Sequence, residues 1–265
     1  MNDRPDPTDG QARPAVQRWR IVYAVEPDDA EGARQARQAA WDQAIRSSGL
    51  PVAGLDGEPP RPRYAPAAPL APAVAGEAEL LDLWLTERLP RWRVRDALAG
   101  VIPVAHRLID VFDVWPGEAA LPGRVAGSVY RIELVPAAAG AAGATDPAAV
   151  RAVVAAMLAA ASLPRERARG EGRVAYDLRP FLDALEVVEG SAPGRIALRM
   201  TLRHDPERGV GRPDEVLAEV GDRLGAPVVA VSTVREGLVL RDGPVVAATT
   251  AASAPRDRSR PGARR

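Results

Sequence analysis

The chain contains 265 residues, 46% of them apolar, and its 35 basic and 35 acidic residues leave no formal net charge. This length and apolar content suffice for one large domain or two small ones, and the zero net charge means that no global field attracts the protein to nucleic acid or to an anionic membrane. The chain has no cysteine, which excludes disulfide bonds, a thiol nucleophile and a cysteine-held iron–sulfur cluster.

Both ends of the chain have compositions typical of disorder. Residues 1–15 are rich in Pro and Asp, and residues 247–265 are rich in Ala, Ser, Pro and Arg, so we expect neither segment to fold. The N-terminus lacks the apolar segment of a secretory signal, and no apolar run is long enough to span a bilayer. We therefore expect a cytoplasmic protein with no membrane partner.

The first half of the folded region, residues 16–116, has the pattern strand, helix, strand, strand, helix, strand. β-Branched and aromatic residues favour the first strand, apolar residues at helical spacing favour the first helix, and alternating apolar residues favour the third strand. The proline-dense second strand is expected at an edge. The six expected elements are residues 16–23, 33–45, 61–66, 77–86, 93–102 and 108–115.

The second half, residues 129–240, repeats this order after a linker of residues 117–128 that is rich in Gly and Pro. Its first helix begins at Asp146 and Pro147, a cap and first-turn pair, and an extended segment is interrupted at Pro180. The expected elements are residues 129–135, 146–160, 174–187, 196–202, 213–224 and 228–234. We therefore predict an α+β fold of two tandem ferredoxin-like (βαββαβ) halves, each with an antiparallel sheet and its helices on one face.

The sequence contains few residues suited to catalysis. Its two histidines, His106 and His204, fall in different halves, where a strand end or a loop is the simplest interpretation, and no ligand spacing suggests a metal site. The serine-nucleophile elbow, the P-loop and the dinucleotide fingerprint are absent. We therefore assign no catalytic residue, no metal and no cofactor.

Three carboxylates on one expected strand form the best acidic cluster. Glu77 and Glu79 share a face of that strand because they are two residues apart, and Asp82 follows on the same strand. The simplest interpretation is that they lie near solvent, with the glutamates opposite Arg61 or Arg63. The alternative is a cluster that meets a metal or acts as the acid–base groups of an enzyme.

Five arginines could bind an anion or RNA phosphates. Arg199 and Arg203 share the polar face of one expected strand, and Arg179 could join them in a basic stripe. We prefer a structural role for Arg179, in a cross-strand ion-pair network with Asp177. Aromatic residues make up only 4% of the chain, so an RNA contact would depend on arginine rather than on base stacking. The five arginines are Arg61, Arg63, Arg179, Arg199 and Arg203.

Several short phrases occur in the order and spacing of one protein family. The clearest are Pro51-Val52, Gly76-Glu77-Ala78-Glu79, Asp177-Leu178-Arg179-Pro180-Phe181 and Arg212-Pro213-Asp214-Glu215. Together with weaker matches they extend from Trp19 to Leu240. This pattern resembles the radical-SAM-associated proteins, a domain of unknown function that is fused to, or encoded beside, a radical-SAM enzyme. The resemblance implies a radical-SAM enzyme as the partner, and the absence of cysteine means that this chain is not itself that enzyme.

The chain departs from that family at the start of the first helix. Family members have a Phe-Leu-Ser-His-Leu-Asp stretch there, and by register from Leu50-Pro51 its His falls on Arg34 and its Asp on Ala36. We therefore identify a divergent member and transfer no catalytic residue to it. The resemblance implies a non-catalytic accessory protein that positions a radical-SAM enzyme or its substrate. An RNA-binding module linked to RNA processing is the alternative, and an enzyme that uses the three carboxylates ranks third.

Overall fold

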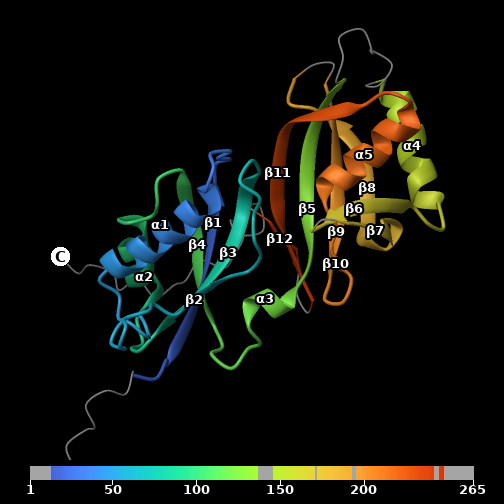
Figure 1. The fold of residues 1–265 in the computed structure, drawn as a ribbon. Helices are drawn as coiled ribbons and strands as arrows, with labels where there is room; N and C mark the ends of the chain where they lie inside the picture. The colour runs from blue at the N-terminus through green and yellow to red at the C-terminus, as the bar shows by residue number, and fades with distance from the viewer. Residues whose placement is uncertain (1–12, 137–145, 171, 193–194, 242–244, 248–265) are drawn as a thin grey trace, which may run out of the picture.

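We describe the fold from a computed structural model of the chain, for residues 13–136, 146–170, 172–192, 195–241 and 245–247 (Figure 1). Within these residues the protein has five α-helices, one ten-stranded mixed sheet and one two-stranded sheet. The predicted α+β class is therefore confirmed. The two segments predicted to be disordered lie almost entirely outside the described residues.

The first block of the fold contains four strands and two helices in the predicted order. Its elements are β1 (Gln17–Val25), α1 (Ala33–Ser47), β2 (Tyr64–Pro66), β3 (Ala75–Leu85), α2 (Arg91–Ala99) and β4 (His106–Val114). The strands lie side by side in the order β4-β1-β3-β2, and each neighbouring pair is antiparallel. β2 is short and lies at the edge, as its prolines predict, because proline cannot donate a ladder hydrogen bond.

The second block follows the same order with an added hairpin. Its elements are α3 (Leu121–Arg124), β5 (Val125–Pro136), α4 (Pro147–Ala159), β6 (Pro164–Arg169), β7 (Gly172–Asp177), a 3-10 turn (Arg179–Phe181), β8 (Leu182–Glu189), β9 (Ile196–Asp205), β10 (Gly209–Val210), α5 (Pro213–Leu224), β11 (Val228–Leu240) and β12 (Val245–Ala247). The strands lie in the order β11-β5-β9-β8 with antiparallel pairing throughout. β6 and β7 form the separate two-stranded sheet.

The two blocks share one continuous sheet. β3 and β11 pair in parallel, through Val234 with Ala75 and Arg235 with Gly76, and the central strand order is β10-β9-β5-β11-β3-β1-β4. The prediction of an antiparallel sheet in each half is corrected to one mixed sheet, because β11 extends through Val234 and Arg235 and pairs with β3 there. Figure 1 shows α1 and α2 on one side of the molecule and α4 and α5 on the other.

Alternate side chains of β1 and β3 form the core beneath the helices of the first block. Trp19 and Ile21 on β1 and Leu81 and Leu83 on β3 are buried together with Trp41 of α1. The two-residue period of the strands points these side chains to one face, and the helical spacing of α1 turns its apolar stripe toward them. This packing fixes α1 over the sheet.

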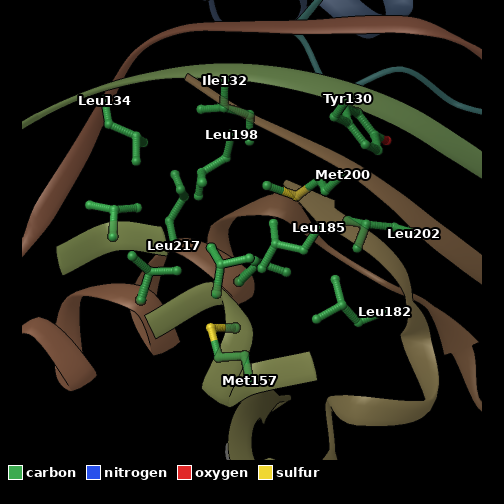
Figure 2. Packing of buried hydrophobic residues seen from close by; sticks show 14 of the residues in the cluster. Tyr130, Ile132, Leu134, Met157, Leu182, Leu185, Leu198, Met200, Leu202 and Leu217 are labelled. Atoms are coloured by element: carbon green, nitrogen blue, oxygen red, sulfur yellow. The ribbon is translucent and has the colours of Figure 1, made fainter. Parts of the chain in front are cut away.

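The core of the second block has the same construction (Figure 2). Ile132 on β5 and Leu198 and Met200 on β9 pack with Met157 of α4 and Leu217 of α5. The alternation predicted for this part of β5 and β9 is therefore confirmed. Burying each such side chain contributes on the order of 1.5–3 kcal/mol.

The segment predicted as a linker, residues 117–128, contains α3 and the first residues of β5. Leu121 and Val125 are buried there with Leu238 and Leu240 of β11, in a third apolar cluster. This cluster also includes side chains of β1 and β3 that alternate with those facing α1, so it covers the opposite face of the first block. A linker was predicted here because the segment is rich in Gly and Pro, and these two residues were therefore not identified as buried.

Candidate functional site

The three predicted carboxylates do not come together as a site. Glu79 is 3% exposed and accepts hydrogen bonds from Arg235, with Nε and Oε1 2.8 Å apart. Asp82 is fully buried and accepts from two arginines of β1, at 2.9 and 2.8 Å. Glu77 is half-buried. Because Glu79 and Asp82 are three residues apart, they lie on opposite faces of β3. Both are buried, whereas the sequence predicted that they lie near solvent.

The arginines predicted to form a basic stripe have local partners instead. Arg199 Nε lies 2.7 Å from a carboxylate oxygen of Glu236, and Arg203 forms an ion pair with Asp183. Arg179 donates to two main-chain carbonyl oxygens, at 2.8 and 3.1 Å. A stripe with three available positive charges is therefore not formed.

Arg179 also differs from its predicted pairing with Asp177. It begins the 3-10 turn rather than lying on a strand. One oxygen of Asp177 accepts the backbone N–H groups of Leu163 at 2.7 Å and of Arg179 at 2.9 Å. Asp177 thus organises the turn through the backbone, and the expected cross-strand ion pair of the two side chains is replaced by this arrangement.

Arg61 and Arg63 lie in different surroundings although both are exposed. Neither forms an ion pair with any residue that the structure describes. The guanidinium carbon of Arg63 lies 4.8 Å from the centroid of the Trp84 ring, a cation–π contact. Arg61 lines a pocket beside α1.

This pocket has a volume of about 730 Å³ and lies between α1, residues 61–70 and the ends of β1 and β3. We term it the α1 pocket. Its lining includes Tyr23 of β1, Glu79 of β3 and His106 of β4. The arginine and aromatic residues that α1 and residues 61–70 contribute to it are Arg34, Arg37, Trp41, Arg61 and Tyr64.

Backbone carbonyl groups hold Arg37 in place. Its Nη2 donates to the carbonyl oxygens of Pro72 at 2.8 Å and of Glu26 at 3.2 Å. Its Nη1 is buried and has no hydrogen-bond partner in the described part of the chain. Leaving a buried donor unsatisfied costs roughly 1–3 kcal/mol, so an acceptor bound beside Nη1 would remove that cost.

Trp41 provides a second buried donor. The residue is 5% exposed, and its indole Nε1 has no hydrogen-bond partner among the described residues. Its ring meets those of Tyr23 and His106 edge-on, with centroids 4.8 and 5.7 Å apart. Burial raises the pKa of Tyr23, and the neighbouring indole of Trp41 acts in the opposite direction.

Helix α1 begins without a capping side chain. Gly32 precedes it with a φ of 78°, a left-handed conformation that suits glycine, and the first turn has no acidic residue. Arg34 and Arg37 occupy the first turns instead, where positive charge is unfavourable beside the positive end of the helix dipole. The absence of a side-chain cap and the two arginines together favour an anion at this end of α1.

The charge of Arg37 affects both titratable rings of the α1 pocket. Burial lowers the pKa of His106, and the Arg37 guanidinium lowers it further. Burial raises the pKa of Tyr23, and Glu79 acts in the same direction, while the Arg37 charge opposes them. Both titratable rings therefore lie within range of the positive charge of Arg37.

Two further properties of the described residues bear on function. Within them, no three His, Asp or Glu side chains come together as metal ligands. None of the helices described is both long and apolar enough to cross a membrane. The cytoplasmic location stays a prediction.

Sequence reasoning identified part of this pocket. It singled out Arg61 and Glu79 by composition and spacing, and Arg34 as the residue at the position of a family histidine. It missed Arg37 and Trp41 as site residues, because helical spacing places Trp41 in the core and nothing in the sequence shows that Nη1 of Arg37 is buried without a partner. The departure at Arg34 was the one available signal at this end of α1.

The fold and the pocket define an α+β protein with a ligand-sized cavity on its first block. The family described as an uncharacterized protein conserved in bacteria (DUF2344) matches residues 36–213. That match covers more than half of the chain, and the protein therefore belongs to the DUF2344 family.

Comparisons with individual proteins are more distant. No curated protein matches the chain. Among solved structures, a Cbf5–Nop10–Gar1 complex is similar with a TM-score of 0.43 and 11% identity, over 82% of this chain and 48% of the other. An archaeal box H/ACA sRNP Nop10–Cbf5 complex is similar with a TM-score of 0.37 and 13% identity, over 81% and 46% of the two chains. The chain thus spans about half the length of these two matched chains.

Proposed function

We propose that this protein is a non-catalytic accessory protein that binds an anionic ligand in the α1 pocket and works with a radical-SAM enzyme. The observation that supports the binding role most strongly is that two residues of the pocket lining, Arg37 and Trp41, each contain a buried donor atom without a hydrogen-bond partner among the described residues. Native proteins leave few buried donors unsatisfied, and each exception calls for an explanation such as a bound group. A ligand with acceptor atoms provides that explanation here.

The state of the carboxylates favours binding over acid–base catalysis. Glu79 is fixed to Arg235, and Asp82 to Arg18 and Arg20, in buried ion pairs. Each of these carboxylates is buried and already hydrogen-bonded to arginine, whereas a general acid or base must be within hydrogen-bond reach of the proton that it transfers. An enzyme built on these residues is therefore the weakest of the three candidate functions.

The radical-SAM partner is supported by the sequence resemblance that extends from Trp19 to Leu240. A protein that holds a substrate for a separate enzyme needs a pocket and a docking surface but no reactive group. The α1 pocket, with arginines and aromatic rings in its lining, suits a protein that binds a substrate while a separate enzyme performs the reaction.

We further propose that the two blocks are duplicated ferredoxin-like units. If the four main strands of each block are numbered by their order along the chain, their order across the sheet is 4-1-3-2 in both blocks. The two orders are β4-β1-β3-β2 and β11-β5-β9-β8. In each block a helix follows the first and the third of these strands. This is the connectivity of a βαββαβ unit, and the parallel contact of β11 with the part of β3 that β2 does not cover then joins two such units in one sheet.

Anaerobic affinity purification from the source organism tests the accessory role. The tagged protein is recovered, and both proteins and small molecules in the eluate are identified. We expect a radical-SAM enzyme in near-stoichiometric amount with the wild type and with Arg93→Gln, a change of an exposed arginine on α2. We expect an anionic small molecule that Arg37→Gln loses. Repeated recovery without any radical-SAM enzyme would exclude the accessory role.

RNA binding is the second candidate, and one observation favours it. Arg34 and Arg61 are exposed at the α1 pocket, and neither forms an ion pair within the described part of the chain. Binding of RNA phosphates by such arginines releases counterions, so the affinity falls steeply with salt. Structured RNA in the same eluate, with no radical-SAM enzyme and a steep salt dependence, would support this candidate, and a flat salt response would exclude it.

A further inference from the structure

We propose that the ligand of the α1 pocket is a phosphate monoester that also carries a planar heterocycle, as a nucleoside monophosphate does, and that Arg37 binds its phosphate. This inference rests on the proposed binding role and adds the chemical class of the ligand. Three features of the pocket support it: arginines that the lining carboxylates do not pair with, a buried guanidinium N–H of Arg37 without a partner in the described residues, and a lining of ring side chains.

The carboxylates that line the α1 pocket are already paired with arginines outside its lining. An oxygen of Asp42 lies 2.6 Å from Arg46 Nε, and Glu79 is bound to Arg235. These two carboxylates therefore do not neutralise the positive charges of the arginines in the lining. A carboxylate ligand compensates one positive charge, whereas a phosphate monoester brings about −1.5 to −2 charges and three acceptor oxygens. The arginines of the lining are Arg34, Arg37 and Arg61.

The donor groups near the start of α1 suit an acceptor-rich group. Arg37 Nη1 is buried and without a partner in the described residues, while Nη2 is fixed by two carbonyl groups. A guanidinium that is already oriented loses little freedom when it binds an anion, and hydrogen bonds to an ionised acceptor are about twice as strong as neutral ones.

The rings of the lining suit a planar heterocycle. Tyr23, Trp41, Tyr64 and His106 all line the α1 pocket. Tyr64 and His106 are only half-buried, and exposed aromatic surface of this kind stacks with heterocyclic rings. The Nδ1 of His106 lies 2.9 Å from the carbonyl oxygen of Val104. Because that oxygen can only accept, Nδ1 bears the hydrogen, and Nε2 of the neutral ring is an acceptor. A ring N–H or amino group complements it, which an aliphatic phosphate could not do.

The size of the pocket agrees with this ligand class. Its volume of about 730 Å³ lies within the roughly 300–1,000 Å³ of pockets that enclose ligands of drug size. Inorganic phosphate alone would leave most of this space, and the ring side chains around it, without a contact.

Isothermal titration calorimetry on the full-length protein tests the proposal. The probes are AMP, UMP, adenosine, inorganic phosphate and benzoate. We expect AMP or UMP to bind at least about tenfold more tightly than adenosine, phosphate or benzoate. Adenosine and benzoate lack the phosphate group, and inorganic phosphate lacks the heterocycle. Arg37→Gln should weaken nucleotide binding at least about tenfold, and Arg93→Gln should leave it unchanged. Trp41→Phe, which keeps a ring but removes the indole N–H, should weaken it less.

Each other outcome overturns a stated part of the proposal. Phosphate binding as tightly as the nucleotides would overturn the planar ring, and benzoate binding equally well would overturn the phosphate. Absence of binding by every probe would overturn the ligand class, while recovery of a radical-SAM enzyme in the affinity purification would leave the accessory role intact. If Arg37→Gln fails to fold by circular dichroism, Arg61→Gln and Trp41→Phe provide the same comparison, and unchanged nucleotide affinity in both would overturn the site.

Discussion

At the scale of single residues, Arg235 and Glu79 form a buried ion pair between two blocks of the chain. Arg235 is 1% exposed, and its Nε lies 2.8 Å from Oε1 of Glu79. Removing one member of a buried pair leaves the other charge uncompensated, which typically costs about 3–5 kcal/mol. We therefore expect Glu79→Leu to lower the free energy of unfolding by about that amount, measured by urea denaturation at neutral pH.

The matched control for that prediction is the double change Glu79→Leu with Arg235→Leu. It removes both charges and restores an apolar contact, so its loss of stability should be smaller than that of Glu79→Leu alone. A double variant at least as unstable as the single one would show that the pair contributes through packing rather than through charge.

His204 gives the stability a defined pH dependence. Burial, and then the charge of Arg235, lowers the pKa of His204 to about 4, whereas a histidine in an unfolded chain titrates near about 6.5. Between these values the unfolded state binds more protons than the folded state. The contribution of His204 to the free energy of unfolding is therefore fully present above about pH 6.5, and it is lost as the pH falls toward the pKa of His204 in the folded state. Because the ring is partly exposed, the loss is roughly 1–2 kcal/mol.

Urea denaturation between pH 7 and pH 5 measures this loss. Burial also lowers the pKa of His106, so that histidine contributes in the same direction. His204→Asn keeps a polar group near Ser128, which lies 3.0 Å from the ring nitrogen, but cannot be protonated there. The variant should lose most of the slope of stability against pH, and an unchanged slope would contradict the account.

The residues of the α1 pocket show where sequence reasoning ends. The types and rough positions of Arg61 and Glu79 could be recognised, but their surroundings could not. Arg37 depends on two carbonyl groups from loops at Glu26 and Pro72, and no local pattern predicts where such loops place their carbonyls. Glu79 is buried because β11 adds Arg235 from a distant part of the chain, a contact that only the fold provides.

At the scale of elements, Gly127 on β5 marks a close approach between two strands. A Cβ built there would lie 2.8 Å from the carbonyl oxygen of Leu202 on β9, closer than the backbone can accept. Gly127→Ala should therefore push β5 from β9 and lower the free energy of unfolding by roughly 1–3 kcal/mol, as overpacking does. Thermal or urea denaturation measures this change.

Gly123 on α3 is the matched control. A Cβ built there meets nothing within 4 Å, and alanine is favoured over glycine in a helix. Gly123→Ala should leave stability unchanged or raise it slightly. Equal destabilisation by both alanines would mean that the β5–β9 approach is not the cause.

Elements with strong periodicity could be predicted, and those held by distant contacts could not. The alternation in β5 and β9 and the apolar stripes of α1, α4 and α5 gave correct elements, because each buries one face. The β6–β7 hairpin was partly missed because β6, Pro164–Arg169, has almost no apolar alternation. The continuation of β11 past Val234 was missed because Arg235 and Glu236 look like the end of a strand, whereas Arg235 is buried against Glu79.

At the scale of the whole molecule, the continuous sheet predicts that the two blocks unfold together. All five tryptophans lie between residues 19 and 115, in the first block or directly after it. Tryptophan fluorescence therefore reports on the first block, while far-UV circular dichroism reports on both. We expect the two signals to change at the same urea concentration, as two-state unfolding requires. Separate transitions in the wild type would show that the β3–β11 contact does not couple the blocks.

The most direct test of the account is a titration of AMP followed by the indole signals in a ¹H–¹⁵N correlation spectrum. The five tryptophans give five such signals, and the one absent from Trp41→Phe belongs to Trp41. The account predicts that the Trp41 signal shifts on addition of AMP as its buried N–H gains an acceptor, and that this shift disappears in Arg37→Gln. A Trp41 signal that stays in place, or shifts confined to the exposed Trp92 and Trp115, would contradict the α1 pocket as the binding site.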